Sequence, residues 1–134
     1  MSTHRYLLDT NICVFLLRGK YDIASHIEEV GIENCCISEI TVAELLYGAA
    51  CSNDVMKNLQ SVKNFCKDID VVPISGCLEI YASQKALLRS QGLLIDDFDM
   101  LIGCTALYHD MVLVSDNTKH FERLPVILDN WVER

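Results

Sequence analysis

The chain has 134 residues, of which 51% are hydrophobic, and a formal net charge of −8. A chain of this length is expected to form one domain and to bury about 65% of the surface that it exposes when unfolded. The acidic charge disfavours broad attraction to the phosphates of nucleic acid. A carboxylate pocket that holds divalent cations would reverse that sign locally, and a basic protein is the other partner that an acidic surface suits.

The sequence has no apolar run near the ~18 residues that a membrane span needs. Residues 1–5 also lack the apolar stretch of a secretory signal. The seven cysteines show no C-x-x-C spacing, so we interpret them as small buried hydrophobes in a reducing compartment. Adjacent Cys35 and Cys36 would point to opposite faces of a strand. Together these features predict a cytoplasmic protein with no membrane partner.

Short apolar runs alternate with longer segments whose apolar residues recur at helical spacing. In chain order, the expected strands are 6–8, 35–37, 69–72, 112–114 and 126–128, and the expected helices are 12–17, 23–30, 39–50, 55–66, 78–90 and 98–108. Ser38, Ser75 and Asp96 are placed to cap the helices that follow them. This alternation predicts an α/β fold, a single domain over 1–134, with a central parallel sheet flanked by helices and strands buried on both faces.

Four acidic residues stand where an apolar segment breaks: Asp9, Glu44, Asp99 and Asp116. Asp9 and Asp116 follow predicted strands, at the ends beyond which α/β sheets bind ligands. Glu44 is the only ionisable group on the narrow polar stripe of its helix, and Asp99 borders the apolar face of its helix. We therefore predict that the four carboxylates meet in one pocket.

Each acid also has a purely structural interpretation, which for Glu44 is a solvated helix face. Asp9 is placed to cap the next helix. Asp97 and Asp99 occupy a first helical turn, where the helix dipole favours carboxylates, and Asp97 projects to the opposite flank from Asp99. Asp116 and Asn117 form an ordinary turn dipeptide. Four independent coincidences at the same end of one sheet are less probable than one site, so the set as a whole favours a functional pocket.

Carboxylates without histidine or cysteine favour a hard cation, Mg²⁺ or Mn²⁺, over zinc. Such a pocket supports attack of water on a phosphodiester, with one acid placed to take the proton. The four histidines are scattered and accompany no nucleophile pattern, and the chain has no glycine-rich nucleotide loop. The group Lys119, His120 and Arg123 has two readings, a contact with a phosphate backbone or an ordinary solvated face.

Four segments, in this order and spacing, resemble the PIN domain, and more narrowly the VapC-type toxins of bacterial toxin–antitoxin pairs. Each motif is short, but the resemblance runs almost from end to end, with Phe121 and Asn130-Trp131 also similar to the family. The segments are Leu7-Leu8-Asp9-Thr10-Asn11, Ile37 to Ala49 with Glu44, Asp97-Phe98-Asp99-Met100-Leu101-Ile102-Gly103, and Leu113-Val114-Ser115-Asp116-Asn117.

The resemblance implies that Asp9, Glu44 and Asp99 bind Mg²⁺ in an endoribonuclease site, with Ser115 at the hydroxyl position of the family. It also implies a parallel sheet between helices, a homodimer, and a cognate antitoxin that blocks the pocket and provides any contact with DNA. We therefore expect the toxin of a type II toxin–antitoxin pair, which hydrolyses RNA by a metal-activated water.

The departure from the family pattern lies at the fourth acid. Many members have an acidic residue where this chain has Asn117, whereas Asp116 comes one position earlier. The contributions of Asp116, Asn117 and Asp97 to the site are therefore left open. Two alternative functions also remain at this point: a PIN-fold binding module that acts through an antitoxin and DNA, and an aspartyl-nucleophile phosphatase, which normally needs a second aspartate where this chain has Asn11.

Overall fold

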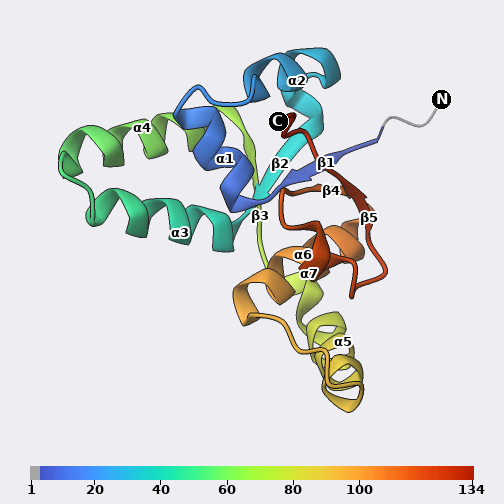
Figure 1. The fold of residues 1–134 in the computed structure, drawn as a ribbon. Coiled ribbons are helices and arrows are strands. Elements are labelled where there is room, and N and C mark those ends of the chain that lie inside the picture. The colour runs from blue at the N-terminus through green and yellow to red at the C-terminus, as the bar shows by residue number, and fades with distance from the viewer. Residues whose placement is uncertain (1–3) are drawn as a thin grey trace.

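A five-stranded sheet crosses the protein, with its strands in the order β3-β2-β1-β4-β5 and every neighbouring pair parallel (Figure 1). The computed structural model describes residues 4–134, so residues 1–3 of the segment considered for a secretory signal lie outside it. The observed strands are β1 (Tyr6–Leu8), β2 (Cys35–Ser38), β3 (Asp70–Val72), β4 (Val112–Val114) and β5 (Ile127–Asp129). The predicted α/β class with a central parallel sheet is confirmed.

The predicted helices all form, three with the predicted ends and three extended by one or two residues at one or both ends. They are α1 (Thr10–Leu17), α2 (Ile23–Val30), α3 (Glu39–Ala50), α4 (Val55–Asp68), α5 (Leu78–Ser90) and α6 (Asp97–His109). The apolar pattern did not predict three short elements: α7 (Thr118–Phe121) and the 3₁₀ turns η1 (Ile32–Asn34) and η2 (Ser75–Cys77). Segments of three or four residues are too short to show a helical period. Within residues 4–134, none of the helices has the length and apolar character that crossing a bilayer would require.

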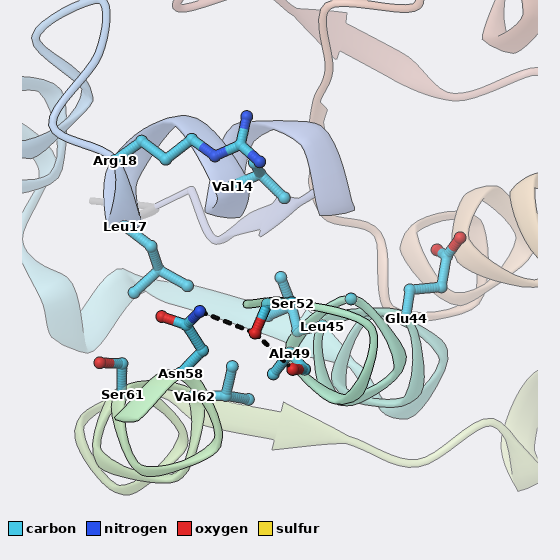
Figure 2. A pocket seen from close by; sticks show the side chains of 11 residues that line it. Val14, Leu17, Arg18, Glu44, Leu45, Ala49, Ser52, Asn58, Ser61 and Val62 are labelled. Atoms are coloured by element: carbon cyan, nitrogen blue, oxygen red, sulfur yellow. Dashed lines mark hydrogen bonds between the residues drawn. The ribbon is translucent and has the colours of Figure 1, made fainter. Parts of the chain in front are cut away.

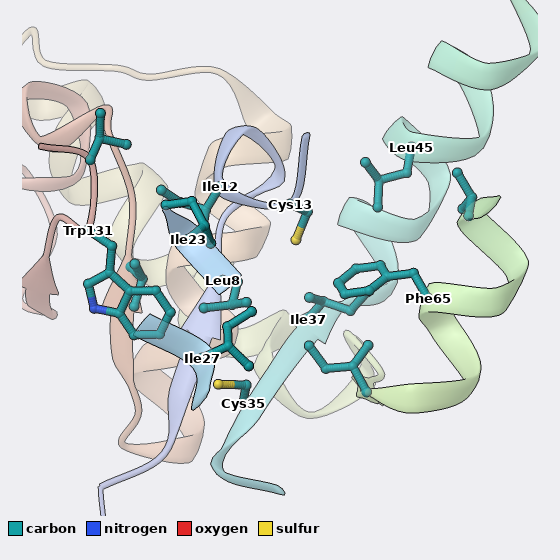
Figure 3. Close-up of a cluster of buried hydrophobic side chains, with 14 of the residues drawn as sticks. Leu8, Ile12, Cys13, Ile23, Ile27, Cys35, Ile37, Leu45, Phe65 and Trp131 are labelled. Carbon is teal, nitrogen blue, oxygen red and sulfur yellow. The ribbon is translucent and has the colours of Figure 1, made fainter. Parts of the chain in front are cut away.

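The two faces of the sheet bury separate hydrophobic clusters. Leu8 and Val114 belong to the cluster under α1 to α4, in which Figure 3 labels Leu8. Leu7 and Leu113 belong to the cluster under α5 to α7, the helices on the other face of the sheet (Figure 1). Successive strand residues point to opposite faces, so each strand contributes to both clusters. The same alternation separates the adjacent cysteines Cys35 and Cys36, as predicted, and all seven cysteines are unpaired.

The expectation that every strand is buried on both faces is wrong for the two edges of the sheet. Val71 in β3 is 40% exposed and Ile127 in β5 is 59% exposed, whereas the residues of β2 and β4 are buried. An edge strand lacks one neighbour, and the helices above and below cover it incompletely.

The predicted caps are confirmed at two of the three helices. Ser38 accepts a hydrogen bond from the amide of Ile40 at 3.0 Å, and Asp96 accepts one from the amide of Phe98 at 3.1 Å. Ser75 is not a helix cap, because it begins the turn η2 and α5 starts three residues later, after Cys77. A capping residue identifies a helix start only when the chain does not insert a 3₁₀ turn there.

We expect Ile37→Ala to lower the free energy of unfolding by about 2 to 5 kcal/mol, because it removes methyl groups from a fully buried position in β2. Ile127→Ala is the matched control, since the same atoms are removed from an exposed position, and its effect should stay within about 0.5 kcal/mol. Urea denaturation of both variants tests this. Similar losses at the two positions would contradict the burial described above.

Candidate active site

The candidate site begins where β1 and β4 end. These two strands are parallel neighbours, with Leu8 paired to Val114, so Asp9 and Ser115 leave the sheet side by side. After β1 the chain fills one side of the sheet with β2 and β3, and later the other side with β4 and β5. The gap between β1 and β4 is therefore the topological switch point, where open α/β sheets form their ligand crevice.

Asp9 is only 4% exposed, and both of its carboxylate oxygens accept hydrogen bonds. Oδ1 accepts from the amide of Thr10 at 2.8 Å, and Oδ2 accepts from the Ser115 hydroxyl at 2.8 Å. The first contact makes Asp9 the N-cap of α1, so the structural interpretation of this residue is correct. The second contact is unrelated to capping and ties the carboxylate to the other strand of the site.

The pKa of Asp9 is raised from 3.8 to about 6, chiefly because burial removes the charged form from water. The hydrogen bonds from Ser115 and Thr10 oppose this rise by stabilising the carboxylate. The negative charges of Asp99 and Glu44 add to it. Three of the four predicted acids therefore lie close enough to repel one another.

Glu44 reaches the site from α3 and is held by a threonine of α1. The Thr10 hydroxyl donates to Glu44 Oε1 at 2.7 Å and lies 3.0 Å from the hydroxyl of Thr41, which is fully buried. Because the single proton of Thr10 is used for Glu44, Thr41 is the donor of the second bond. Neither threonine was among the predicted site residues. The available signals were that Thr10 follows Asp9 and that Thr41 shares the polar stripe of Glu44.

Glu44 also lines a groove of about 250 Å³ between α1, α3 and α4 (Figure 2). Gly48, one helical turn further along α3, lines the same groove, and no atom lies near the place that a side chain would occupy there. Arg18 is the only basic residue of the lining. Glu44 and Gly48, on the polar side of this helix, thus line an open groove, whereas Thr41 on the same side is fully buried.

Asp99 is the third residue of α6, and its side chain is 24% exposed. Burial raises its pKa, and the charges of Asp96 and Glu44 raise it further. His120 has the opposite effect, with its Nδ1 atom 3.7 Å from Asp99 Oδ2. Asp99 therefore lies near Glu44, and its charge also raises the pKa of Asp9.

A short hydrogen-bond chain connects Ser115 to this histidine. The buried Ser115 hydroxyl accepts from the amide of Asn117 at 2.9 Å, and Asn117 Nδ2 lies 2.9 Å from His120 Nδ1. The sequence suggested only that His120 belonged to a basic group. Its place beside Asp99 depends on α7, the short helix that the sequence did not reveal.

Asp116 lies apart from the three acids that repel one another. Its carboxylate is bound by both terminal nitrogens of Arg134, at 2.9 and 2.8 Å, and by Asn130 at 3.2 Å. Arg134 lowers the pKa of Asp116, whereas the charge of Asp116 makes no contribution to the raised pKa values of Asp9 and Asp99. The structure thus brings three of the four predicted acids together and leaves the fourth in an ion pair.

Asp97 also turns away from the pocket, toward α5. Its Oδ1 atom accepts from Lys85 at 2.7 Å and from the Tyr81 hydroxyl at 2.8 Å, and these bonds lower its pKa. This position agrees with the expected projection of Asp97 to the flank opposite Asp99. Its observed contacts join α5 to α6.

The oxygen donors of this site suit a divalent cation that keeps several waters better than one that is enclosed by side chains alone. Within residues 4–134, no group of three or more histidine, cysteine or acidic side chains lies close enough to enclose an ion. Mg²⁺ usually keeps several waters and binds through one or two carboxylates. All donors here are oxygens, and a cation would relieve the mutual repulsion that raises the pKa of Asp9.

We expect Asp9→Asn to stabilise the protein at pH 7.5 in EDTA. The ionised form of Asp9 is disfavoured in the folded state, so the contribution of this residue to stability is highest below pH 3.8 and is lost as the pH rises through about 6. Asparagine does not ionise, and the gain is on the order of 3 kcal/mol. Urea denaturation at pH 4 and 7.5 measures it, with exposed Asp110→Asn as the control. Equal unfolding energies for wild type and Asp9→Asn at pH 7.5 would contradict the inference that burial disfavours the charge of Asp9.

A family model and individual relatives of this chain indicate the same protein family. The sequence model of the PIN domain matches residues 6–127. Ribonuclease VapC2 of Rickettsia felis is 34% identical over 130 residues, which cover 94% of this chain and 97% of the relative. The tRNA(fMet)-specific endonuclease VapC of Shigella flexneri is 32% identical over 121 residues, which cover 90% and 92%.

The fold agrees with these sequence matches. The crystal structure of VapBC2 from Rickettsia felis, bound to a DNA fragment from its promoter, aligns with a TM-score of 0.87 and 32% identity. That alignment covers 94% of this chain and 98% of the solved chain. The five-stranded parallel sheet and the acidic switch point of this chain are thus accompanied by similarity to these proteins over nearly the whole length. The chain therefore belongs to the PIN domain family and, within it, to the VapC group.

Proposed function

We propose that this chain is an Mg²⁺-dependent endoribonuclease and the toxin of a type II toxin–antitoxin pair. The observation that carries this proposal is the burial of Asp9 beside Asp99 and Glu44, at the carboxyl ends of a parallel sheet. The VapC relatives are named as ribonucleases or as a tRNA endonuclease. An acidic pocket at this place suits the metal-assisted hydrolysis of an RNA phosphodiester.

Asp9 and Asp99 are the principal candidates to hold the cation, with Glu44 assisting directly or through a water. The contacts of Asp9 with Ser115 and of Glu44 with Thr10 orient these two acids in advance. When bound, Mg²⁺ supplies a water of lowered pKa and neutralises charge on the phosphodiester, and Mn²⁺ is chemically able to replace it.

Asn117 and Asp116 differ in what they offer the site. Asn117 is linked to Ser115 through its amide and to His120 through its side chain, so its neutral side chain is placed to order a water rather than to bind a cation by charge. Asp116 is neutralised by Arg134. We therefore assign the support of the pocket at this turn to Ser115 and Asn117.

An aspartyl-nucleophile phosphatase has less support. A nucleophilic carboxylate must expose one oxygen to its substrate. Asp9 is buried, and its two oxygens are engaged with Thr10 and Ser115. These contacts suit an oriented ligand better than an attacking group.

We infer that the natural partner is a cognate antitoxin, and that any contact with DNA is made through it. The VapBC2 structure that this chain resembles is bound to promoter DNA, while the net charge of −8 of this chain is unsuited to direct contact with DNA phosphates. A cytoplasmic location suits an RNA substrate and seven unpaired cysteines. A homodimer remains a prediction from the family resemblance.

We expect purified protein, freed of antitoxin, to cleave a mixed RNA pool with Mg²⁺ and to lose cleavage in EDTA. Asp99→Asn should reduce the rate by at least about 100-fold, because it removes a charge that faces the cation and not merely a supporting contact. Asp110→Asn, at the other end of the same helix, is the matched control and should cleave at the wild-type rate.

Cleavage that survives in EDTA or in Asp99→Asn would overturn the assignment of the metal-dependent site. If no preparation cleaves RNA and mass spectrometry finds no retained antitoxin, the alternative of a PIN-fold binding module gains support. Binding of the antitoxin and promoter DNA by Asp99→Asn, compared with wild type, then tests that alternative directly.

A further inference from the structure

The contact between Arg134 and Asp116 fixes the turn that follows β4. Nη1 and Nη2 of Arg134 donate to the two oxygens of the carboxylate at 2.9 and 2.8 Å. The guanidinium group also lies over the ring of Tyr21, 5.4 Å from its centroid. A two-point contact between planar groups determines orientation as well as distance, which a single-point ion pair does not.

Three successive residues of this turn are each anchored to a different part of the protein. The Ser115 hydroxyl is bound to Asp9, the Asp116 carboxylate to Arg134, and the Asn117 side chain to His120. Of these anchors, only the middle one involves a full ion pair with two hydrogen bonds. Because a turn of three residues has few free dihedral angles, loss of the middle anchor affects both neighbours.

The position of Arg134 is well defined, because the segment after β5 packs against the rest of the protein. Trp131 is 3% exposed and stacks on His26, with ring centroids 5.3 Å apart and planes 9° apart. Its ring also lies 5.6 Å from that of Tyr6 in β1. Figure 3 shows Trp131 in the cluster under α1 to α4, and Figure 1 places the end of the chain beside α2.

We propose that Arg134 is a positioning residue for the acidic site: by clamping Asp116, it holds Ser115 in the orientation that binds Asp9 Oδ2. Within residues 4–134, the Ser115 bond is one of two hydrogen bonds that orient the Asp9 carboxylate. Arg134 itself does not contact Asp9, so its effect passes through the turn. The contact between Arg134 and Asp116 does not depend on the proposed function, whereas its consequence for cation binding rests on that function.

A positioning role of the contact between Arg134 and Asp116, called the clamp from here on, can be distinguished from a general contribution to the stability of the protein. The Arg134 side chain is 59% exposed, although that of Asp116 is only 18% exposed, and an ion pair that water reaches adds little to the free energy of folding because water screens it and the side chains lose freedom. Contacts that orient a ligand, in contrast, commonly change metal affinity by about 10-fold to 100-fold. The clamp should therefore affect the site strongly and the melting temperature weakly.

The test compares Arg134→Gln, Arg134→Lys and Asp116→Asn with Arg5→Gln as the matched control. Arg5 forms an exposed ion pair with Asp70 where the strands β1 and β3 begin, at the opposite end of the strands from the acidic site. Two readouts use the RNA-free protein: Mn²⁺ affinity by electron paramagnetic resonance, and hydrogen exchange of the Asn117 amide by NMR. The Asn117 amide reports on the turn because it donates to the Ser115 hydroxyl.

We expect Arg134→Gln to weaken Mn²⁺ binding by about 10-fold and to accelerate exchange of the Asn117 amide, with an almost unchanged melting temperature. Arg134→Lys should restore little, since an ammonium group lacks the two-point geometry. The double variant with Asp116→Asn should be no weaker in Mn²⁺ binding than either single variant, because both changes remove the same contact. Arg5→Gln should match wild type in both readouts.

If Arg134→Gln showed the wild-type exchange rate at the Asn117 amide and the wild-type affinity for Mn²⁺, the proposal that Arg134 orients Ser115 would be wrong. The proposed function fails in a different way, since wild type itself would then bind no Mn²⁺ and cleave no RNA. Faster exchange at Asn117 in Arg134→Gln would still support the clamp on the turn in that case.

Discussion

The hydrogen bond from the Ser115 hydroxyl to Asp9 Oδ2 joins residues 106 positions apart and depends on the parallel pairing of β1 with β4. Parallel strands bring their carboxyl ends to one edge, so the residues that follow them meet there. Leu8 and Val114 on one face, and the neighbouring strand residues on the other, hold the register in buried clusters. A slip of one residue would reverse the faces of β4 and move Ser115 away from Asp9.

The same arrangement places the negative charge of Asp9 in a buried position close to the charges of Glu44 and Asp99. Burial and the charges of Asp99 and Glu44 raise the pKa of Asp9, so the ionised carboxylate opposes folding at neutral pH. The hydrophobic clusters on both faces of the sheet supply the stability that offsets this opposition. The same unfavourable charge makes the pocket attractive to a divalent cation, which links a local cost in stability to the proposed chemistry.

The acids near the site divide according to their cationic partners. Asp97 and Asp116 each form an ion pair with a lysine or an arginine and support the structure around the pocket. In the described part of the chain, Asp9 and Glu44 have no ion-pair partner, and Asp99 has only His120 at 3.7 Å. Carboxylates without a lysine or arginine partner are those free to hold a cation, and this distinction cannot be read from residue type.

The sequence by itself determined the α/β class, the order of the main elements and most of the acidic set, because apolar periodicity and local capping act over a few residues. It did not reveal α7, which is too short for a period, and therefore did not place His120 beside Asp99. Only the tertiary structure decided that Asp116 faces Arg134 and that Thr10 bridges to Glu44. These contacts join separate elements, and their geometry is fixed by how the sheet and helices pack, which no local pattern encodes.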